Sequence, residues 1–141
     1  MHEATRRLEW DMGHRVPEHG GKCRTPHGHR YVAEVTVRGP LGREGFVLDF
    51  GEIKQKLGAW IDDHLDHTTA YQRGDELMEA MARLNDEHGL KPFFPMSAPP
   101  TAEALAKLLH RVASDMLDAE VVRVVVHETP NCSASFSRNH Q

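Results

Sequence analysis

Two histidines at the start of an alternating segment constrain the fold of this chain more than any other feature. His27 and His29 come just before 30–37, where apolar and polar side chains alternate as in a strand. If the strand begins by His27, its two-residue period places both imidazoles on the same face of a sheet. Two imidazoles side by side on a rigid element form half of a zinc site. Gly28 between them adds no side chain on the opposite face, so backbone or ligand can approach closely there.

The rest of the chain reads as further strands around a helical middle. The order is β-β-α-(α)-α-β-β, which predicts an α+β sheet with helices on one face. A loop is expected over 91–100 because it carries four prolines. The expected strands are 5–11, 28–38, 121–127 and 133–138, and the expected helices are 51–63, 75–88 and a third that begins after Thr101 and reaches Met116.

Length and charge exclude several classes of protein. A chain of 141 residues with 39% hydrophobic content predicts one domain with a real core. The net charge of −4 and the pI near 6.2 argue against nucleic acid or an anionic membrane as partner. No apolar run approaches the ~18 residues that span a bilayer, and the first residues lack the apolar core of a signal peptide. With two cysteines and no disulfide framework, we expect a reduced, cytoplasmic protein.

A third metal ligand is expected at the end of the first strand. His14 closes that strand, so antiparallel pairing across the connecting loop brings it to His27 and His29. Three histidine nitrogens and one open position are typical of catalytic zinc. The alternative is that the strand histidines are half-exposed side chains that form ordinary hydrogen bonds.

Cys23 is a candidate for proton transfer. Lys22 and Arg24 flank it, and neighbouring positive charge favours the thiolate. Two other interpretations stay open: a fourth zinc ligand that closes a structural site, or a small buried apolar side chain. Cys132 has no such neighbours and is expected to be structural.

Two further places carry carboxylates suited to catalysis or binding. Asp66 stands beside His67 and could orient it for proton transfer, although a histidine near the end of a helix is also a common solvated terminus. Glu128 ends an apolar strand, where a ligand edge with two N–H donors would satisfy both carboxylate oxygens. A surface acid in a turn is the alternative for Glu128.

Together these motifs resemble those of the 6-pyruvoyltetrahydropterin synthase family, and within it the bacterial 6-carboxytetrahydropterin synthases. The resemblance covers almost the whole chain, and the three-residue spacing between Cys23 and His27 is similar to that of the bacterial members. It implies a tunnelling fold, in which a four-stranded antiparallel sheet with helices on one face joins neighbouring copies into a barrel, as a trimer or hexamer. The resembling segments are Trp10-Asp11-Met12-Gly13-His14, Gly21-Lys22-Cys23-Arg24-Thr25-Pro26-His27-Gly28-His29, Val47-Leu48-Asp49-Phe50, Leu65-Asp66-His67, Pro100-Thr101-Ala102-Glu103 and His127-Glu128-Thr129.

The resemblance also implies an activity. It implies zinc-dependent conversion of 7,8-dihydroneopterin triphosphate to 6-carboxytetrahydropterin, acetaldehyde and triphosphate, a step toward queuosine. Two alternatives are a 6-pyruvoyltetrahydropterin synthase, which retains the three-carbon side chain, and a non-catalytic protein whose structural zinc site is closed by Cys23 beside the three histidines. The resemblance implies that His14, His27 and His29 bind zinc. It implies that Cys23 is the general base and that Asp66 and His67 of an adjacent subunit relay its proton. Substrate binding is implied for Glu128, Thr129 and Thr101.

The chain departs from the family pattern in three places. The usual aromatic-x-Ala-Ala-His sequence is here Trp10-Asp11-Met12-Gly13-His14. Thr68-Thr69-Ala70 follows Asp66-His67, where many bacterial members continue differently. The segment 68–98 is longer than in compact members and contains its own expected helix, so within a single domain of residues 1–141 it is interpreted as an insertion.

Overall fold

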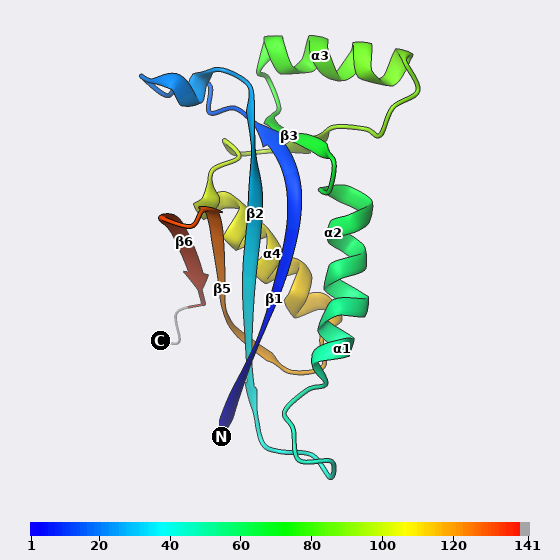
Figure 1. Cartoon of the computed structure of the whole chain (residues 1–141), viewed down its shortest axis with the longest axis vertical. Coiled ribbons are helices and arrows are strands. Elements are labelled where there is room, and N and C mark those ends of the chain that lie inside the picture. The colour runs from blue at the N-terminus through cyan, green and yellow to red at the C-terminus, as the bar shows by residue number, and fades with distance from the viewer. Residues whose placement is uncertain (139–141) are drawn as a thin grey trace.

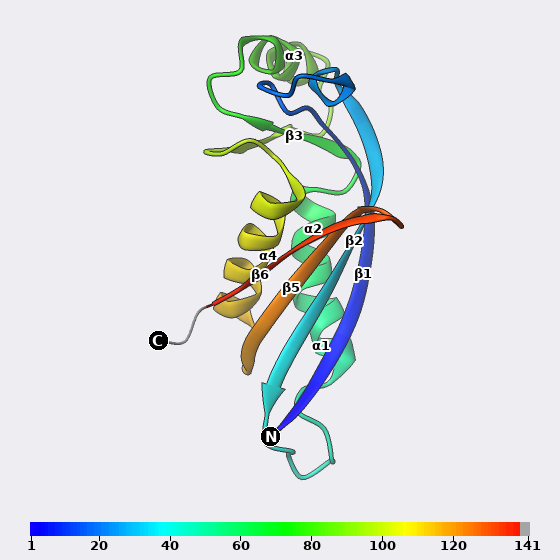
Figure 2. The ribbon, with the colours of Figure 1, turned by 90° about the vertical axis from the view of Figure 1, so that its left-hand side faces the viewer.

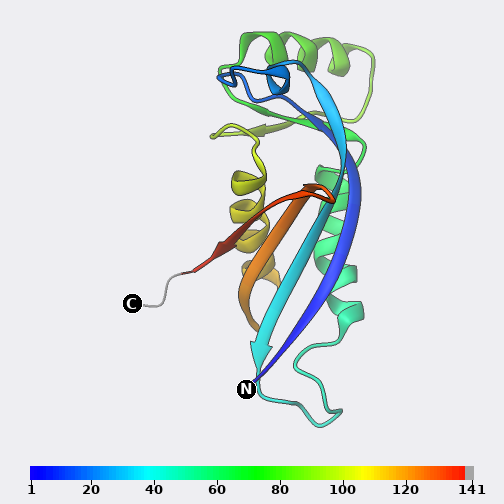
Figure 3. The same ribbon diagram turned by 60° about the vertical axis from the view of Figure 1, so that its left-hand side comes forward.

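The computed structural model describes residues 1–138, so residues 139–141 of the expected domain lie outside the described part. The chain forms an α+β fold built on one curved sheet, as predicted. Its strands lie in the order β4-β3-β1-β2-β5-β6, and Figures 1 and 3 show the long β1 and β2 at its centre. The strands are β1 (His2–His14), β2 (His27–Gly39), β3 (Thr68–Gln72), β4 (Phe94–Met96), β5 (Glu120–Thr129) and β6 (Cys132–Ser137).

The β1–β2 hairpin carries the candidate histidines. The two strands pair antiparallel over their whole length, with His14 opposite His27 and Met12 opposite His29. Side chains alternate across each strand, so His14, His27 and His29 share the helix-facing side of the sheet. The pairing expected from the sequence is confirmed, and both strands are longer than their predicted ranges.

The helices cover one face of the sheet, as predicted, which Figure 2 shows from the side. The expected helix over 51–63 is one run made of α1 (Phe50–Ile53), a π-helical stretch η2 (Lys54–Gly58) and α2 (Ala59–His64). α4 (Ala102–Met116) begins at Thr101, whose hydroxyl accepts a hydrogen bond from Ala104 N–H. Burying the apolar stripes of these helices against β1, β2 and β5 forms one core. Its largest fully buried apolar side chains include Trp10, Tyr31, Ile53, Leu57, Ile61, Leu65, Leu105 and Leu109.

The expected number of strands was wrong, because the sheet has six strands and not four. β3 pairs parallel with the end of β1, and β4 pairs parallel with β3. β4 lies inside 91–100, which the prolines had marked as a loop. Pro95 is compatible with that strand because β4 is an edge strand, where a missing N–H donor breaks no ladder.

The segment 68–98, interpreted above as an insertion, contains the two strands β3 and β4 with a helix between them. Its helix α3 (Glu76–Glu87) confirms the prediction over 75–88 and begins at Asp75, whose carboxylate accepts from Met78 N–H. Figures 1 and 2 show α3 at the same end of the molecule as the turn η1 (Lys22–Arg24). Within the described residues, none of the helices has the length and apolar character needed to cross a membrane.

Candidate metal centre

The three expected histidines meet at one end of the β1–β2 hairpin. The Nε2 atom of His27 lies 3.1 Å from Nε2 of His14 and 3.1 Å from Nε2 of His29. All three rings present a nitrogen to one point, with the ligand atoms within 4.8 Å of one another. The structure therefore brings together the trio predicted from the sequence.

Backbone carbonyls fix the protonation of two of these rings. His14 Nδ1 lies 2.7 Å from the carbonyl oxygen of Pro100, and His27 Nδ1 lies 2.7 Å from that of Thr25. A carbonyl oxygen only accepts, so each Nδ1 must carry the proton and each neutral ring turns an unprotonated Nε2 inward. Histidine ligands of metals are oriented by this kind of hydrogen bond.

The resulting geometry fits a bound cation. Two inward lone pairs 3.1 Å apart repel each other unless a positive charge lies between them. Tetrahedral zinc with bonds of about 2.0–2.1 Å to nitrogen separates its ligand atoms by roughly 3.3 Å. The trio needs to open by only a few tenths of an ångström to reach that spacing, so its residues fit the metal that the sequence predicted.

Burial favours the neutral, ligating form of His14 and His29. His14 is 1% exposed, and burial is the main cause that lowers its pKa below the ordinary histidine value. Burial also lowers the pKa of His29, although the carboxylate of Glu128 acts in the opposite direction. A Glu128 oxygen lies 4.0 Å from His29 Nε2, so this acid stands at the rim of the histidine trio.

Cys23 lies outside the trio. It sits half-buried in η1, which leads into β2. In the described part of the chain, the group of ligand atoms within 4.8 Å of one another holds the three histidines without the Cys23 sulfur. A metal held by these three nitrogens would keep a coordination position for water or substrate, as catalytic zinc does.

Asp66 and His67 belong to a different group. Asp66 Oδ1 lies 2.9 Å from His67 Nδ1 and accepts from Asp11 N–H at 3.1 Å. Partial burial acts to raise the pKa of Asp66, but the hydrogen bonds from Asp11 and His67 leave it below the usual value. Asp11 is exposed and alternates with the buried Met12, so it points away from the histidine trio. Within one chain the structure does not join this pair to the trio.

His67 has a strained backbone. Its φ is 60°, the left-handed region that few non-glycine residues adopt, and its N–H donates to Asp11 O at 2.7 Å. The ring is 73% exposed while its Asp66 partner is held in place. An exposed histidine in a costly, well-fixed conformation is a stronger candidate for function than the solvated helix end considered above.

The two threonines expected to bind substrate have structural hydrogen bonds of their own. Thr101 caps α4 next to Pro100, so its hydroxyl stands one residue from the carbonyl that orients His14. The Thr129 hydroxyl accepts from Asn131 N–H in the β5–β6 turn. Their expected contact with substrate stays a prediction.

Tyr31 is a site residue that the sequence analysis missed. Its ring centroid lies 5.4 Å from that of His29 and 5.8 Å from that of His14, and its side chain is fully buried. Its hydroxyl finds no hydrogen-bond partner among the described protein groups. Burial raises the pKa of Tyr31 well above the ordinary value, and the charges of Glu128 and Cys23 act in the same direction. Alternation along β2 was the available signal, since Tyr31 follows His29 by two residues.

A shallow hollow of about 410 Å³ has one residue of each group, His29 and His67, in its lining. Its floor includes Gly13 and Gly28, which face each other across the hairpin. A Cβ at position 13 would lie 2.9 Å from Thr69 Oγ1, so β3 packs this closely only because Gly13 has no side chain. Gly13, one of the residues that depart from the expected sequence before His14, thus permits the close packing of β3 on β1.

Comparisons with known proteins agree with this architecture. The sequence model of the family described as 6-pyruvoyl tetrahydropterin synthase matches residues 3–139. A protein of Rickettsia bellii named 6-carboxy-5,6,7,8-tetrahydropterin synthase is 36% identical over 137 residues, covering 94% of this chain and 97% of its own length. A Halobacterium salinarum protein named as a probable synthase of the same kind is 35% identical, covering 92% of this chain and 82% of its own.

Solved structures share the fold. The Caenorhabditis elegans 6-pyruvoyl tetrahydropterin synthase superposes with a TM-score of 0.72 at 19% identity, over 98% of this chain and 96% of that one. An uncharacterised protein of Wolinella succinogenes reaches a TM-score of 0.85 at 18% identity, over 98% of each chain. The tunnelling fold expected from the sequence is confirmed.

Proposed function

The chain belongs to the 6-pyruvoyl tetrahydropterin synthase family, and from this premise we propose that it is a zinc-dependent tetrahydropterin synthase. The proposed reaction converts 7,8-dihydroneopterin triphosphate to 6-carboxy-5,6,7,8-tetrahydropterin, acetaldehyde and triphosphate, a step toward queuosine. The product follows the names of the curated relatives at 34–36% identity. The observation that carries the proposal is the trio of Nε2 atoms with Cys23 outside it.

Each side chain has a proposed role in this reaction. Bound zinc would act as a Lewis acid that polarises a substrate oxygen, and His14, His27 and His29 would hold it. Cys23 would take and return a proton beside the substrate side chain, since a thiolate is a competent base. Glu128 would accept two N–H groups of the pterin ring and so orient the substrate toward the trio. Its position 4.0 Å from His29 supports this assignment.

Product analysis tests the reaction. The protein is loaded with zinc and incubated with 7,8-dihydroneopterin triphosphate, and the products are identified by mass spectrometry. Release of acetaldehyde supports the proposal. Release of triphosphate with a retained three-carbon side chain would instead favour a 6-pyruvoyltetrahydropterin synthase, the name carried by the family and by the C. elegans structure. Absence of any pterin product would contradict both.

We further propose that the active site is completed by an adjacent copy. Among the described residues, β1 pairs on its second side only through Met12–His14, so residues 2–11 keep one free edge, and β6 pairs only with β5. Pairing β6 of one copy with β1 of the next would satisfy both edges and close a ring. The separation of Asp66 and His67 from the trio within one chain supports a shared site.

Subunit complementation tests the shared site. Cys23→Ala and His67→Ala are each expected to abolish turnover. Co-refolded mixtures should regain activity, up to about a quarter of the wild-type value for random mixing in a cyclic oligomer. Mixtures that stay inactive, or a single-chain mass by light scattering, would show that each site belongs to one chain.

A further inference from the structure

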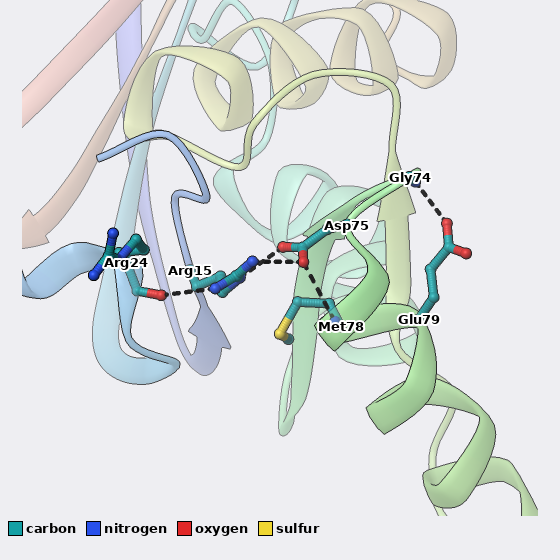
Figure 4. Close-up of polar contacts among 6 residues, drawn as sticks. All are labelled: Arg15, Arg24, Gly74, Asp75, Met78 and Glu79. Carbon is teal, nitrogen blue, oxygen red and sulfur yellow. Dashed lines mark hydrogen bonds and ion pairs between the residues drawn. The ribbon is translucent and has the colours of Figure 1, made fainter. Parts of the chain in front are cut away.

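Arg15 joins the turn that carries Cys23 to the inserted segment. Its Nε and Nη2 atoms donate to Asp75 Oδ2 and Oδ1, each at 2.7 Å, and its Nη1 donates to the carbonyl oxygen of Arg24 at 3.1 Å. Figure 4 shows the guanidinium between these two partners. One side chain at the end of β1 therefore bonds both to η1 and to the residue that begins α3.

The Arg15–Asp75 pair is built as a fixed element. Both carboxylate oxygens accept in the parallel, bidentate arrangement that gives such pairs their geometric specificity. The Asp75 side chain is 1% exposed and that of Arg15 is 16% exposed. Asp75 is itself anchored because it caps α3. Asp75 thus fixes the orientation of the guanidinium that donates to the carbonyl oxygen of Arg24.

The turn itself has few other restraints. None of the residues in η1 is buried, and the glycine pair Gly20-Gly21 precedes it. Two consecutive carbonyl groups tie it to the end of β1: Cys23 O accepts from Val16 N–H at 3.0 Å, and Arg24 O accepts from Arg15. These two bonds join the turn that carries Cys23 to Arg15 and Val16, the residues that directly follow His14.

From these contacts we infer that Arg15 is a positioning residue for Cys23, and that Asp75 extends this role to the inserted segment 68–98. The insertion then contributes to the active site without contacting substrate, because it holds the guanidinium that fixes the turn η1. This inference rests on the proposed function in one respect, the assignment of proton transfer to Cys23.

Thiol labelling tests the inference without relying on turnover. Zinc-loaded protein is treated with iodoacetamide, and alkylation of Cys23 and Cys132 is followed separately by peptide mass spectrometry. Asp75→Asn removes the ion pair, and Arg15→Lys keeps the charge but loses the fork that bridges both partners. In both variants we expect Cys23, which is half-buried, to be alkylated several-fold faster because the turn around it loosens. Exposed Cys132 serves as internal standard and should not change.

Turnover and metal content complete the test. Misplacement by about 1 Å can cost on the order of 100-fold in rate, so kcat should fall at least tenfold while KM changes little and zinc stays at one per chain. Glu79→Gln is the matched control, because Glu79 lies on the same helix and accepts from Gly74 N–H, away from η1 (Figure 4). It should label and turn over like the wild type.

Several outcomes would overturn the inference. Unchanged Cys23 labelling in Arg15→Lys and Asp75→Asn would show that the pair does not hold the turn. Zinc loss with unchanged labelling would show that Arg15 acts through His14 instead. Should Asp75→Asn fail to fold, as judged by circular dichroism, Arg15→Lys alone decides. An active Cys23→Ala enzyme would remove the assigned chemistry of Cys23, whereas the labelling result would still report on the turn.

Discussion

Withdrawal of zinc is the perturbation whose effect on stability follows most directly from the geometry of the metal centre. His14 and His27 are oriented by backbone carbonyls of the folded chain, so the site exists before the metal binds. We therefore expect the metal-free protein to remain folded, unlike a zinc finger, but to lose the stabilisation that binding contributes. The repulsion between the inward nitrogens 3.1 Å apart remains in the metal-free state.

The magnitude follows from mass action and chain length. Free zinc at a thousand times its dissociation constant stabilises the native state by about 4 kcal/mol. For 141 residues, the unfolding entropy is about 0.3 kcal/mol/K, from roughly 2 cal/mol/K per residue. The melting temperature should thus rise by about 14 °C on zinc loading, with each tenfold change in free zinc worth about 1.4 kcal/mol.

Thermal melts followed by circular dichroism, in zinc buffers and in chelator, measure this difference. His27→Ala should abolish most of the zinc-dependent rise because it removes the central member of the trio. His88→Ala is the control, since His88 is exposed at the end of α3, and it should keep the full rise. A melting temperature that does not change with zinc, or an equal zinc-dependent rise in His27→Ala and wild type, would refute the reasoning.

Four further predictions concern single side chains. Tyr31→Phe removes a buried hydroxyl without a protein partner, so the free energy of unfolding in urea should stay equal or rise by about 1 kcal/mol; a clear loss would reveal a hydrogen bond. The hydrogen bonds from Arg15 lower the pKa of Asp75 in the folded state, so the unfolded state binds more protons in that window. Stability should fall as pH drops below about 4, and Asp75→Asn should flatten this fall in acid titrations. Cys23→Ala should keep its zinc, measured by metal analysis, and lose turnover. Glu128→Gln should weaken pterin binding, measured by calorimetry, on the order of tenfold or more while its metal content stays unchanged.

Much of the fold was predictable because it depends on local patterns. The alternation along β2 and the cap at Thr101 each predicted their elements. β3 and β4 were missed because each has few residues and is stabilised by pairing with a distant partner rather than by its own pattern. The prolines around β4 pointed to a loop, and only its place at the sheet edge explains how Pro95 is accommodated.

The candidate site, like the fold, could be predicted from the sequence only where it depends on local patterns. His14, His27 and His29 follow from strand periodicity plus antiparallel pairing, so their convergence could be predicted. The contact of His14 with Pro100 and that of Arg15 with Asp75 join residues 86 and 60 positions apart, and no spacing rule indicates them. The position of the Asp66–His67 pair likewise depends on hydrogen bonds to the backbone of Asp11, which lies 55 positions before Asp66.

X-ray absorption at the zinc edge tests the central claim most directly, that three imidazoles hold the metal while the sulfur of Cys23 stays off it. The account predicts a first shell of nitrogen and oxygen at about 2.0–2.1 Å, with outer-shell scattering from three imidazole rings. A sulfur ligand at about 2.3 Å would identify a closed structural site and contradict the proposed catalytic role.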